Sequence, residues 1–95
     1  MAAYVIAMIK VTDAEGYEAY KEMAPRSITE HGGRYLARGG RTDVLEGEPD
    51  ADRFVVLEFE SYAQAQTWWN SPVYEAAKPH RRKSATSTLV LVDGV

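Results

Sequence analysis

The C-terminal half of the chain constrains the fold most, because its residues mark where each element begins. An apolar run from Arg53 to Glu60 predicts a strand, and Ser61 follows as a helix cap with Gln64 three residues later. Ser71-Pro72 begins a further helix, since a cap residue followed by proline is typical of a first helical turn. The run from Ser87 to Asp93 predicts a closing strand. This half is therefore predicted as a strand, a divided helix and a strand.

The N-terminal half begins with another strand and a long helix. Tyr4 to Val11 is nearly all apolar and rich in β-branched residues, which predicts a strand buried on both faces. Asp13 can cap a helix that starts at Ala14 and ends at Gly32-Gly33. Pro25 lies inside this helix, so we expect a kink or a restart there. Residues spaced three and four positions apart lie on the same side of a helix, which predicts one largely apolar stripe formed by Tyr17, Tyr20, Ala24, Ile28 and His31.

A second pair of extended segments follows the helix. Arg34 to Ala37 predicts a short strand, and Gly39-Gly40 predicts a bulge or sharp bend. Thr42 to Glu46 is expected to resume extended chain before a turn-rich loop over residues 47–52. The order is then β-α-β-β-α-β, which is the ferredoxin-like α+β arrangement of an antiparallel sheet with helices on one face.

The first and last strands are apolar on both faces, which bears on assembly. A two-layer monomer would expose the second face as a large apolar patch, and soluble monomers rarely tolerate such a patch. We therefore expect a homodimer in which two sheets pack face to face.

The composition excludes several classes of protein. Ninety-five residues allow a single domain, residues 1–95. A net charge of −3 argues against nucleic acid as a partner, and there are no cysteines for disulfides or thiolate metal sites. No apolar run is long enough to span a membrane, and no signal peptide is visible, so a cytoplasmic protein is expected. We expect no metal, because neither histidine has a recognised ligand spacing.

Glu58 is the carboxylate that stands out, because it interrupts an apolar strand. Strand alternation places it with Phe54 and Val56, on the face opposite Phe59. It could act as a general base or orient a substrate. The favoured interpretation is a structural ion pair, with Arg38, Arg41 or Arg53 as partner.

Four further residues are candidates for a site. Arg38 precedes a glycine pair that permits close approach of a ligand, and its guanidinium suits an anionic group. His31, near the end of the first helix, could transfer a proton. Trp68 and Tyr74 could form an aromatic wall for a small flat ligand. Ordinary packing and surface salt bridges are the alternatives for each of them.

Trp68 and its neighbour Trp69 point about 100° apart on a helix, so one of them is expected to pack in the core. Phe59 is expected to lie beside Trp69.

Several of these segments together resemble a known family. Gly33, Arg38-Gly39-Gly40, Glu46-Gly47, the tryptophan pair and the stretch from Ser71-Pro72 to Arg81 make the chain similar to the bacterial DUF1330 family, a branch of the dimeric α+β barrel superfamily. The resemblance implies a dimeric α+β barrel and leaves the biochemical function unassigned. The Arg-Gly-Gly match implies that Arg38 belongs to the family's pattern.

Two functions remain open. The first is a dimer that binds a small aromatic or carboxylate metabolite in a cleft between the helices and the sheet. The alternative, by analogy with superfamily relatives, is a cofactor-independent enzyme, monooxygenase- or isomerase-like, that acts on a small organic substrate. In both cases Arg38, Trp68 and Tyr74 would bind the ligand, and in the enzyme Glu58 and His31 would be catalytic. The chain shows no convincing nucleophile–base pair, which favours binding without turnover.

Overall fold

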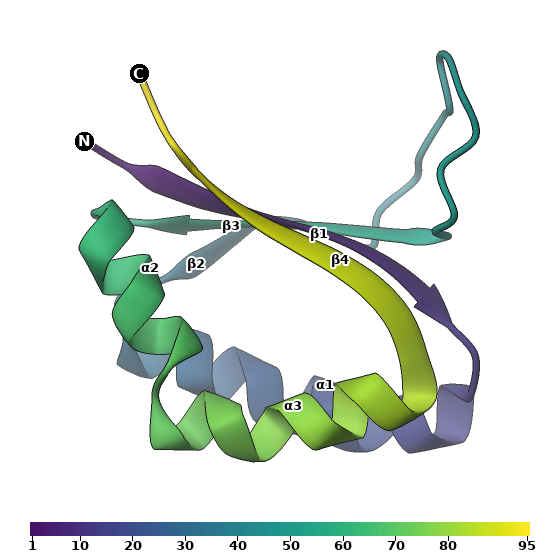
Figure 1. The fold of residues 1–95 in the computed structure, drawn as a ribbon, viewed down its shortest axis with the longest axis horizontal. Coiled ribbons are helices and arrows are strands. Elements are labelled where there is room, and N and C mark those ends of the chain that lie inside the picture. Colours follow the sequence, from purple (N-terminus) through teal and green to yellow (C-terminus); the bar gives the residue numbers. More distant parts are fainter.

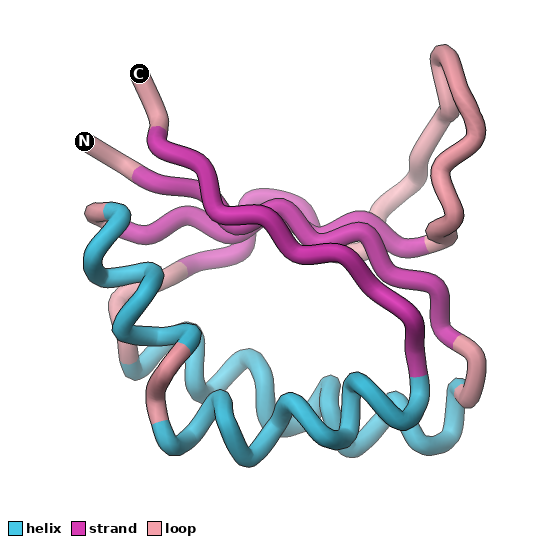
Figure 2. Tube along the Cα trace, viewed as in Figure 1, coloured by secondary structure: helices cyan, strands magenta, loops and turns pink.

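A computed structural model describes all of residues 1–95 and confirms the ferredoxin-like fold. The elements are β1 (Ala3–Val11), α1 (Ala14–Glu30), β2 (Arg34–Arg38), β3 (Arg53–Phe59), α2 (Tyr62–Trp69), α3 (Pro72–Ser84) and β4 (Ala85–Asp93). The strands form one antiparallel sheet in the order β2-β3-β1-β4. All three helices lie on the same face of this sheet (Figures 1 and 2). None of them is long and apolar enough to cross a membrane.

The ends of α1 are set by local chemistry. The Asp13 side chain accepts a hydrogen bond from the Gly16 amide at 3.1 Å, as the sequence predicted. At the other end Gly32 has a φ of +71°, and the amides of Gly32 and Gly33 donate to the carbonyls of Thr29 and Ile28. This pattern is a Schellman motif, which requires a left-handed residue at the glycine. The expected restart at Pro25 is wrong, because the helix is continuous through it: packing of the buried stripe outweighs one lost backbone donor.

The caps of α2 and α3 also match the sequence, with one difference. Ser61 accepts from the Gln64 amide at 3.1 Å, and Ser71 accepts from the Tyr74 amide at 3.2 Å. The side chain of Gln64 does not close the capping box. Its Nε2 donates instead to the carbonyl of His31 at 2.7 Å. This bond joins the C-terminal end of α1 to α2.

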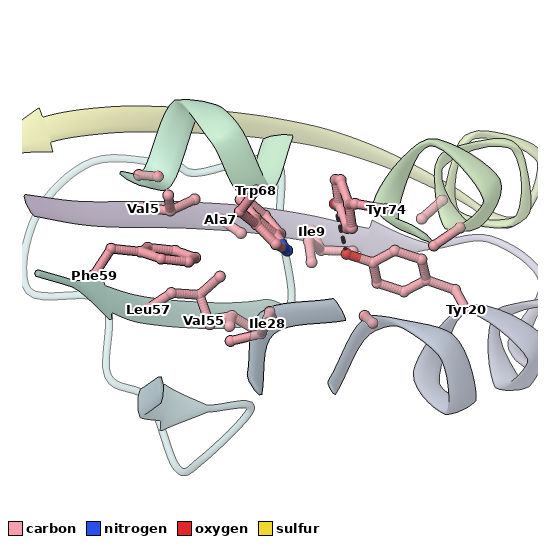
Figure 3. Close-up of a cluster of buried hydrophobic side chains, with 14 of the residues drawn as sticks. Val5, Ala7, Ile9, Tyr20, Ile28, Val55, Leu57, Phe59, Trp68 and Tyr74 are labelled. Atoms are coloured by element: carbon pink, nitrogen blue, oxygen red, sulfur yellow. Dashed lines mark hydrogen bonds between the residues drawn. The ribbon is translucent and has the colours of Figure 1, made fainter. Parts of the chain in front are cut away.

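The core lies between the helices and the inner face of the sheet (Figure 3). The core includes Val5, Ile9, Tyr20, Ile28, Phe59, Ala65 and one tryptophan, which confirms the burial predicted for Tyr20, Ile28 and one of the two tryptophans. That tryptophan is Trp68, which is 1% exposed and lies 5.3 Å from the Phe59 ring, centroid to centroid. The expected contact of Phe59 with Trp69 is wrong, since the rotation between adjacent helical residues leaves Trp69 half-buried at the edge.

The outer face of the sheet is apolar and no helix covers it (Figure 1). The paired registers place its residues in rows across the strands: Tyr4, Ile6, Met8, Phe54, Val56, Val90 and Val92. Val90 is 47% exposed, and Ile6 and Val92 are also exposed. The strands are therefore apolar on both faces, as predicted, and one of these faces is open.

Residues 39–52 form a long loop between β2 and β3. It projects away from the helices, beyond the outer face of the sheet (Figure 1). No strand forms over residues 42–46, where extended chain was expected, and Leu45 is 95% exposed. A bulge or sharp bend was predicted at Gly39-Gly40; the bend forms there, whereas the irregularity in pairing lies between Tyr35 and Ala37. Gly39 makes the bend at the strand end, with a φ of +64°, and a side chain there would collide with the Arg53 guanidinium.

Candidate functional site

Glu58 lies on the outer face of the sheet and forms an ion pair. Its Oε1 accepts from Nε of Arg34 at 2.6 Å. The sequence favoured an ion pair but named the wrong arginines. The register explains the difference: Arg34 stands directly opposite Glu58, whereas Arg38 pairs with Val55 on the inner face.

His31 caps the C-terminal end of α1. Its Nδ1 lies 2.8 Å from the carbonyl oxygen of Ser27. Because a carbonyl only accepts, Nδ1 carries the proton, and in the neutral ring Nε2 keeps a free lone pair. The residue is 14 positions beyond Tyr17 on the same helix, or about 21 Å along the axis. His31 is thus at the far end of the helical layer from the start of α1.

Arg38 lies at the end of β2. Its guanidinium carbon is 4.5 Å from the centroid of the Tyr35 ring, and its side chain is exposed. Burial raises the pKa of Tyr35, and the charge of Arg38 partly offsets that rise. Arg38 therefore stands at the rim of the helix–sheet layer.

Trp68 and Tyr74 lie together inside the core (Figure 3). Their ring centroids are 4.2 Å apart. The indole Nε1 of Trp68 donates to Oγ of Ser27 at 3.0 Å, and the hydroxyls of Tyr74 and Tyr20 lie 2.8 Å apart. Both aromatic residues have their polar atoms satisfied within the protein. They form an interior wall and not an exposed surface.

The five candidate residues do not form one constellation. Trp68 and Tyr74 are neighbours in the core, and Arg38 stands at its rim. Glu58 faces the other side of the sheet, and His31 lies at the opposite end of α1 from Tyr17. The candidate residues are therefore divided between the two faces of the sheet.

A small cavity lies on the inner face. Its volume is about 30 Å³. Its polar lining consists of Tyr17, Tyr20, Tyr35, Lys21, Arg38 and Arg53, and the other lining residues are apolar core residues with Trp68 among them. Burial raises the pKa of Tyr17 and of Tyr20, and nearby arginines lower each only in part. The phenols of Tyr17 and Tyr20 are therefore neutral hydrogen-bonding groups near neutral pH.

Arg53 and Arg81 also lie on the inner side of the sheet. Neither of them was among the ligand-binding residues predicted from the sequence. Arg53 has the same strand parity as Val55 and Leu57, so alternation alone would have turned it inward. Arg81 lies four positions after Ala77 and seven after Tyr74, on the buried stripe of α3. Its Nη1 donates to Oγ of Ser87 at 2.6 Å.

A second hollow lies at the β4 edge, beside α2. It measures about 370 Å³ and is lined mainly by apolar residues, with Trp69 and Leu91 among them. Its only polar side chains are Gln66 and Asn70. Nowhere in residues 1–95 do three His, Cys, Asp or Glu side chains gather in a way that could hold a metal ion.

These features define a ferredoxin-like α+β protein. One face of its sheet is apolar and open, and a small cavity on the other face is lined by tyrosines, arginines and apolar residues. Within that class the chain belongs to the DUF1330 family, a domain of unknown function, whose family model matches residues 2–95. The resemblance predicted from the sequence is confirmed. No curated protein sequence matches the chain.

Solved structures show the same fold. The RPA0582 protein of unknown function from Rhodopseudomonas palustris superposes with a TM-score of 0.79 at 22% identity, covering 99% of this chain and 82% of that one. A dimeric ferredoxin-like protein of unknown function from Jannaschia sp. CCS1 gives 0.71 at 14% identity, with 99% and 100% covered. SnoaB, a cofactor-independent oxygenase from Streptomyces nogalater, gives 0.67 at 14% identity, with 99% and 93% covered. At these identities the likeness shows the fold alone.

Proposed function

We propose that the protein is a homodimer that binds a small aromatic or carboxylate metabolite between its helices and its sheet. The observation that carries this proposal is the chemical difference between the two faces of one sheet. The outer face is a continuous apolar surface that no helix covers. The inner face holds a cavity whose lining includes arginines and neutral tyrosines.

The outer face supports the dimer. Rows of apolar residues such as Ile6, Val56 and Val90 run across three strands, and burial against a second copy would remove them from water. A two-fold axis would bring the same surface of each chain into contact, which is the commonest arrangement of homodimers. The similar protein from Jannaschia is described as dimeric. Residues 39–52 project on this same side and would flank the contact (Figure 1).

The inner cavity supports ligand binding. Its walls are aromatic and aliphatic, and a few polar groups converge on it, which is the usual composition of a small-molecule site. Its volume of about 30 Å³ holds the polar group of a ligand, so the ring would lie toward the rim. Arg38 is exposed and Tyr35 and Lys21 are half-buried, so this rim offers a path from solvent to the interior. Trp68 would serve as the inner wall, with Tyr74 packed against it.

Turnover by a cofactor-independent enzyme is the second candidate, and the fold shared with SnoaB is the observation in its favour. Such chemistry needs a group that takes or gives a proton near neutral pH. No carboxylate or histidine lines the inner cavity, and burial keeps Tyr17 and Tyr20 neutral. These observations favour binding without turnover.

Nuclear magnetic resonance titration of the labelled protein with phenol and with benzoate tests this proposal. We expect the signals of the inner residues Ile9, Val55 and Leu89 to shift, and those of the outer residues Ile6 and Val90 to stay unchanged. Shifts confined to the β4-edge hollow around Trp69 and Asn70, or to His31, would contradict the inner site.

A matched pair of alanine substitutions adds a control. Ala7→Val adds two methyl groups to the cavity lining, whereas Ala37→Val adds them on the outer side of β2. We expect Ala7→Val to weaken probe binding and Ala37→Val to leave it unchanged. Equal effects of the two variants would count against the cavity.

A further inference from the structure

Two guanidinium groups enter the space between sheet and helices without an acidic partner. Arg53 lies on the inner face at the start of β3, and Arg81, on α3, is only 4% exposed. Neither forms a salt bridge, and the Nε atom of each is buried without a hydrogen-bond partner. Arg53 is half-buried, but an unpaired charge as deeply buried as that of Arg81 disfavours the folded state and needs an explanation.

The two arginines approach the same level of the sheet. Ile9 of β1 pairs with Arg53 on one side and with Ser87 on the other. Adjacent strands lie about 4.8 Å apart, so Arg53 and Ser87 are about 10 Å apart across Ile9. Arg81 reaches this row from α3 through its 2.6 Å hydrogen bond to Ser87. Arg53 and the contact of Arg81 with Ser87 thus stand on either side of Ile9 at one level of the inner face.

A pair of tyrosine rings connects the two cations. The guanidinium carbon of Arg53 lies 5.9 Å from the Tyr17 ring centroid, and that of Arg81 lies 5.8 Å from the Tyr20 ring centroid. The two rings are 5.3 Å apart. Burial raises the pKa of both phenols despite the arginines, so the tyrosines supply no negative charge. Within the chain neither guanidinium group therefore has an anionic partner.

Resting on the proposed binding function, we propose that Arg53 and Arg81 together bind the carboxylate of a small organic acid. Guanidinium groups offer planar pairs of N–H donors that match a carboxylate, and the buried Nε atoms are donors of this kind. The cavity beside Tyr17 and Tyr20 has room for a water-sized polar group. The body of the acid extends past Tyr35 and Arg38 toward solvent.

A carboxylate fits this site better than a phosphate does. Phosphate sites are typically built on the free backbone amides of a helix N-terminus. The N-terminus of α1, near Tyr17, is already capped by Asp13 and carries Glu15 in its first turn. The remaining lining is largely apolar, and a singly charged anion costs less to transfer from water than a doubly charged one.

Calorimetric titration with three probes tests the ligand class. Benzoate and benzamide have the same shape and differ in charge, and inorganic phosphate supplies charge without a ring. We expect benzoate to bind at least about tenfold more tightly than either of the others. Equal affinity for benzoate and benzamide would overturn the carboxylate site and leave the proposed cleft standing. Tighter binding of phosphate would overturn the carboxylate class. No binding of any probe at millimolar concentration would overturn the inference and the proposed function together.

Arginine substitutions then locate the site. Arg81→Met and Arg53→Met keep an apolar stem and remove the guanidinium, and we expect each to weaken benzoate binding about 10- to 100-fold. Arg82→Met and Arg41→Met change two exposed arginines, and we expect them to leave binding unchanged. Losses of equal size in the exposed controls would contradict the assignment, because they would show only a general effect of charge.

The thermal stability of the ligand-free protein separates binding from a structural role. Without ligand, Arg81 is a buried cation with an unfilled donor, so Arg81→Met is expected to leave the thermal midpoint unchanged or to raise it. Benzoate should raise the midpoint of the native protein and not that of the variant. A lower midpoint with benzoate affinity retained would show that Arg81 is structural and overturn the inference. If Arg81→Met does not fold, Arg53→Met and the comparison of benzoate with benzamide decide the question.

Discussion

Arg34 and Glu58 face each other across β2 and β3 and form an ion pair of 2.6 Å on the outer side of the sheet. The Glu58 side chain is 22% exposed in the single chain, and that of Arg34 is largely exposed. Their position assigns the strand carboxylate to the surface proposed for the dimer contact. The same position separates Glu58 from the inner cavity by the thickness of the sheet.

Glu58→Gln should therefore affect assembly and not ligand binding. Exposed ion pairs contribute about 0.2–1 kcal/mol, so the free energy of unfolding should fall by no more than that in the separated chain. The dimer should dissociate at a higher concentration than the native protein, measured by sedimentation equilibrium. Glu60→Gln, at an exposed neighbouring position, is the control. Loss of benzoate binding by an intact Glu58→Gln dimer would instead place the carboxylate in the site.

Ile6→Asp tests the apolar contact itself. It puts a charge at the centre of the outer face, where burial against a second copy would remove it from water. Light scattering at micromolar concentration should report about twice the 10.6 kDa chain mass for the native protein and a monomer for this variant. Ala63→Asp is the control, because a carboxylate in the first turn of α2 is favourable and lies on the helical layer.

Salt dependence gives an independent check on that contact. A largely apolar interface should persist at high salt, since screening weakens mainly exposed charge pairs. Dissociation of the native dimer on adding salt would show that ion pairs such as Arg34–Glu58 hold it together.

Trp68→Ala should destabilise the fold far more than Trp69→Ala. Trp68 is buried against Phe59 and Tyr74 and donates a hydrogen bond to Ser27, so its removal should cost about 3–5 kcal/mol. Trp69 is half-buried beneath the Lys78 ammonium, and we expect a smaller loss there. Urea unfolding of the native protein and the two variants, at one fixed protein concentration, measures both losses of stability. Equal losses would contradict the assignment of Trp68 as the core tryptophan.

Alkaline pH should destabilise the protein through its buried tyrosines. Burial raises the pKa of Tyr20 in the folded state, whereas the unfolded chain titrates near its ordinary value of about 10. Above about pH 10 the unfolded state therefore binds fewer protons than the folded state, and stability falls as pH rises. The slope should be about 1.4 kcal/mol per pH unit for each such tyrosine.

Tyr20→Phe should reduce that alkaline slope, and Tyr62→Phe, at an exposed position, should leave it unchanged. Stability measured between about pH 8 and pH 11 checks both variants. An identical slope in the native protein and Tyr20→Phe would show that Tyr20 ionises freely in the fold.

The fold was predictable because local chemistry marks its boundaries. Caps at Asp13, Ser61 and Ser71, with the glycine pair after α1, act within three or four residues of their own positions. The open apolar face was predictable for a similar reason, since strand alternation is a property of consecutive residues.

The site was less predictable because it depends on register and on packing between distant elements. Glu58 pairs with Arg34 only because the register of β2 against β3 places the two residues opposite each other. Trp68 faces the core only because of the rotation of α2 about its axis. Arg53 and the contact of Arg81 with Ser87 lie on either side of Ile9 because of how β3 and β4 pair with β1. No local pattern in the chain encodes that arrangement.

A crystal structure of the protein with benzoate tests the central proposal most directly. We predict two chains related by a two-fold axis, with outer sheet faces in contact, and one benzoate per chain on the inner side. Its carboxylate should lie within hydrogen-bond distance of Arg53 and Arg81. Outer faces open to solvent, with benzoate in the hollow beside Trp69 and Asn70, would contradict the proposal.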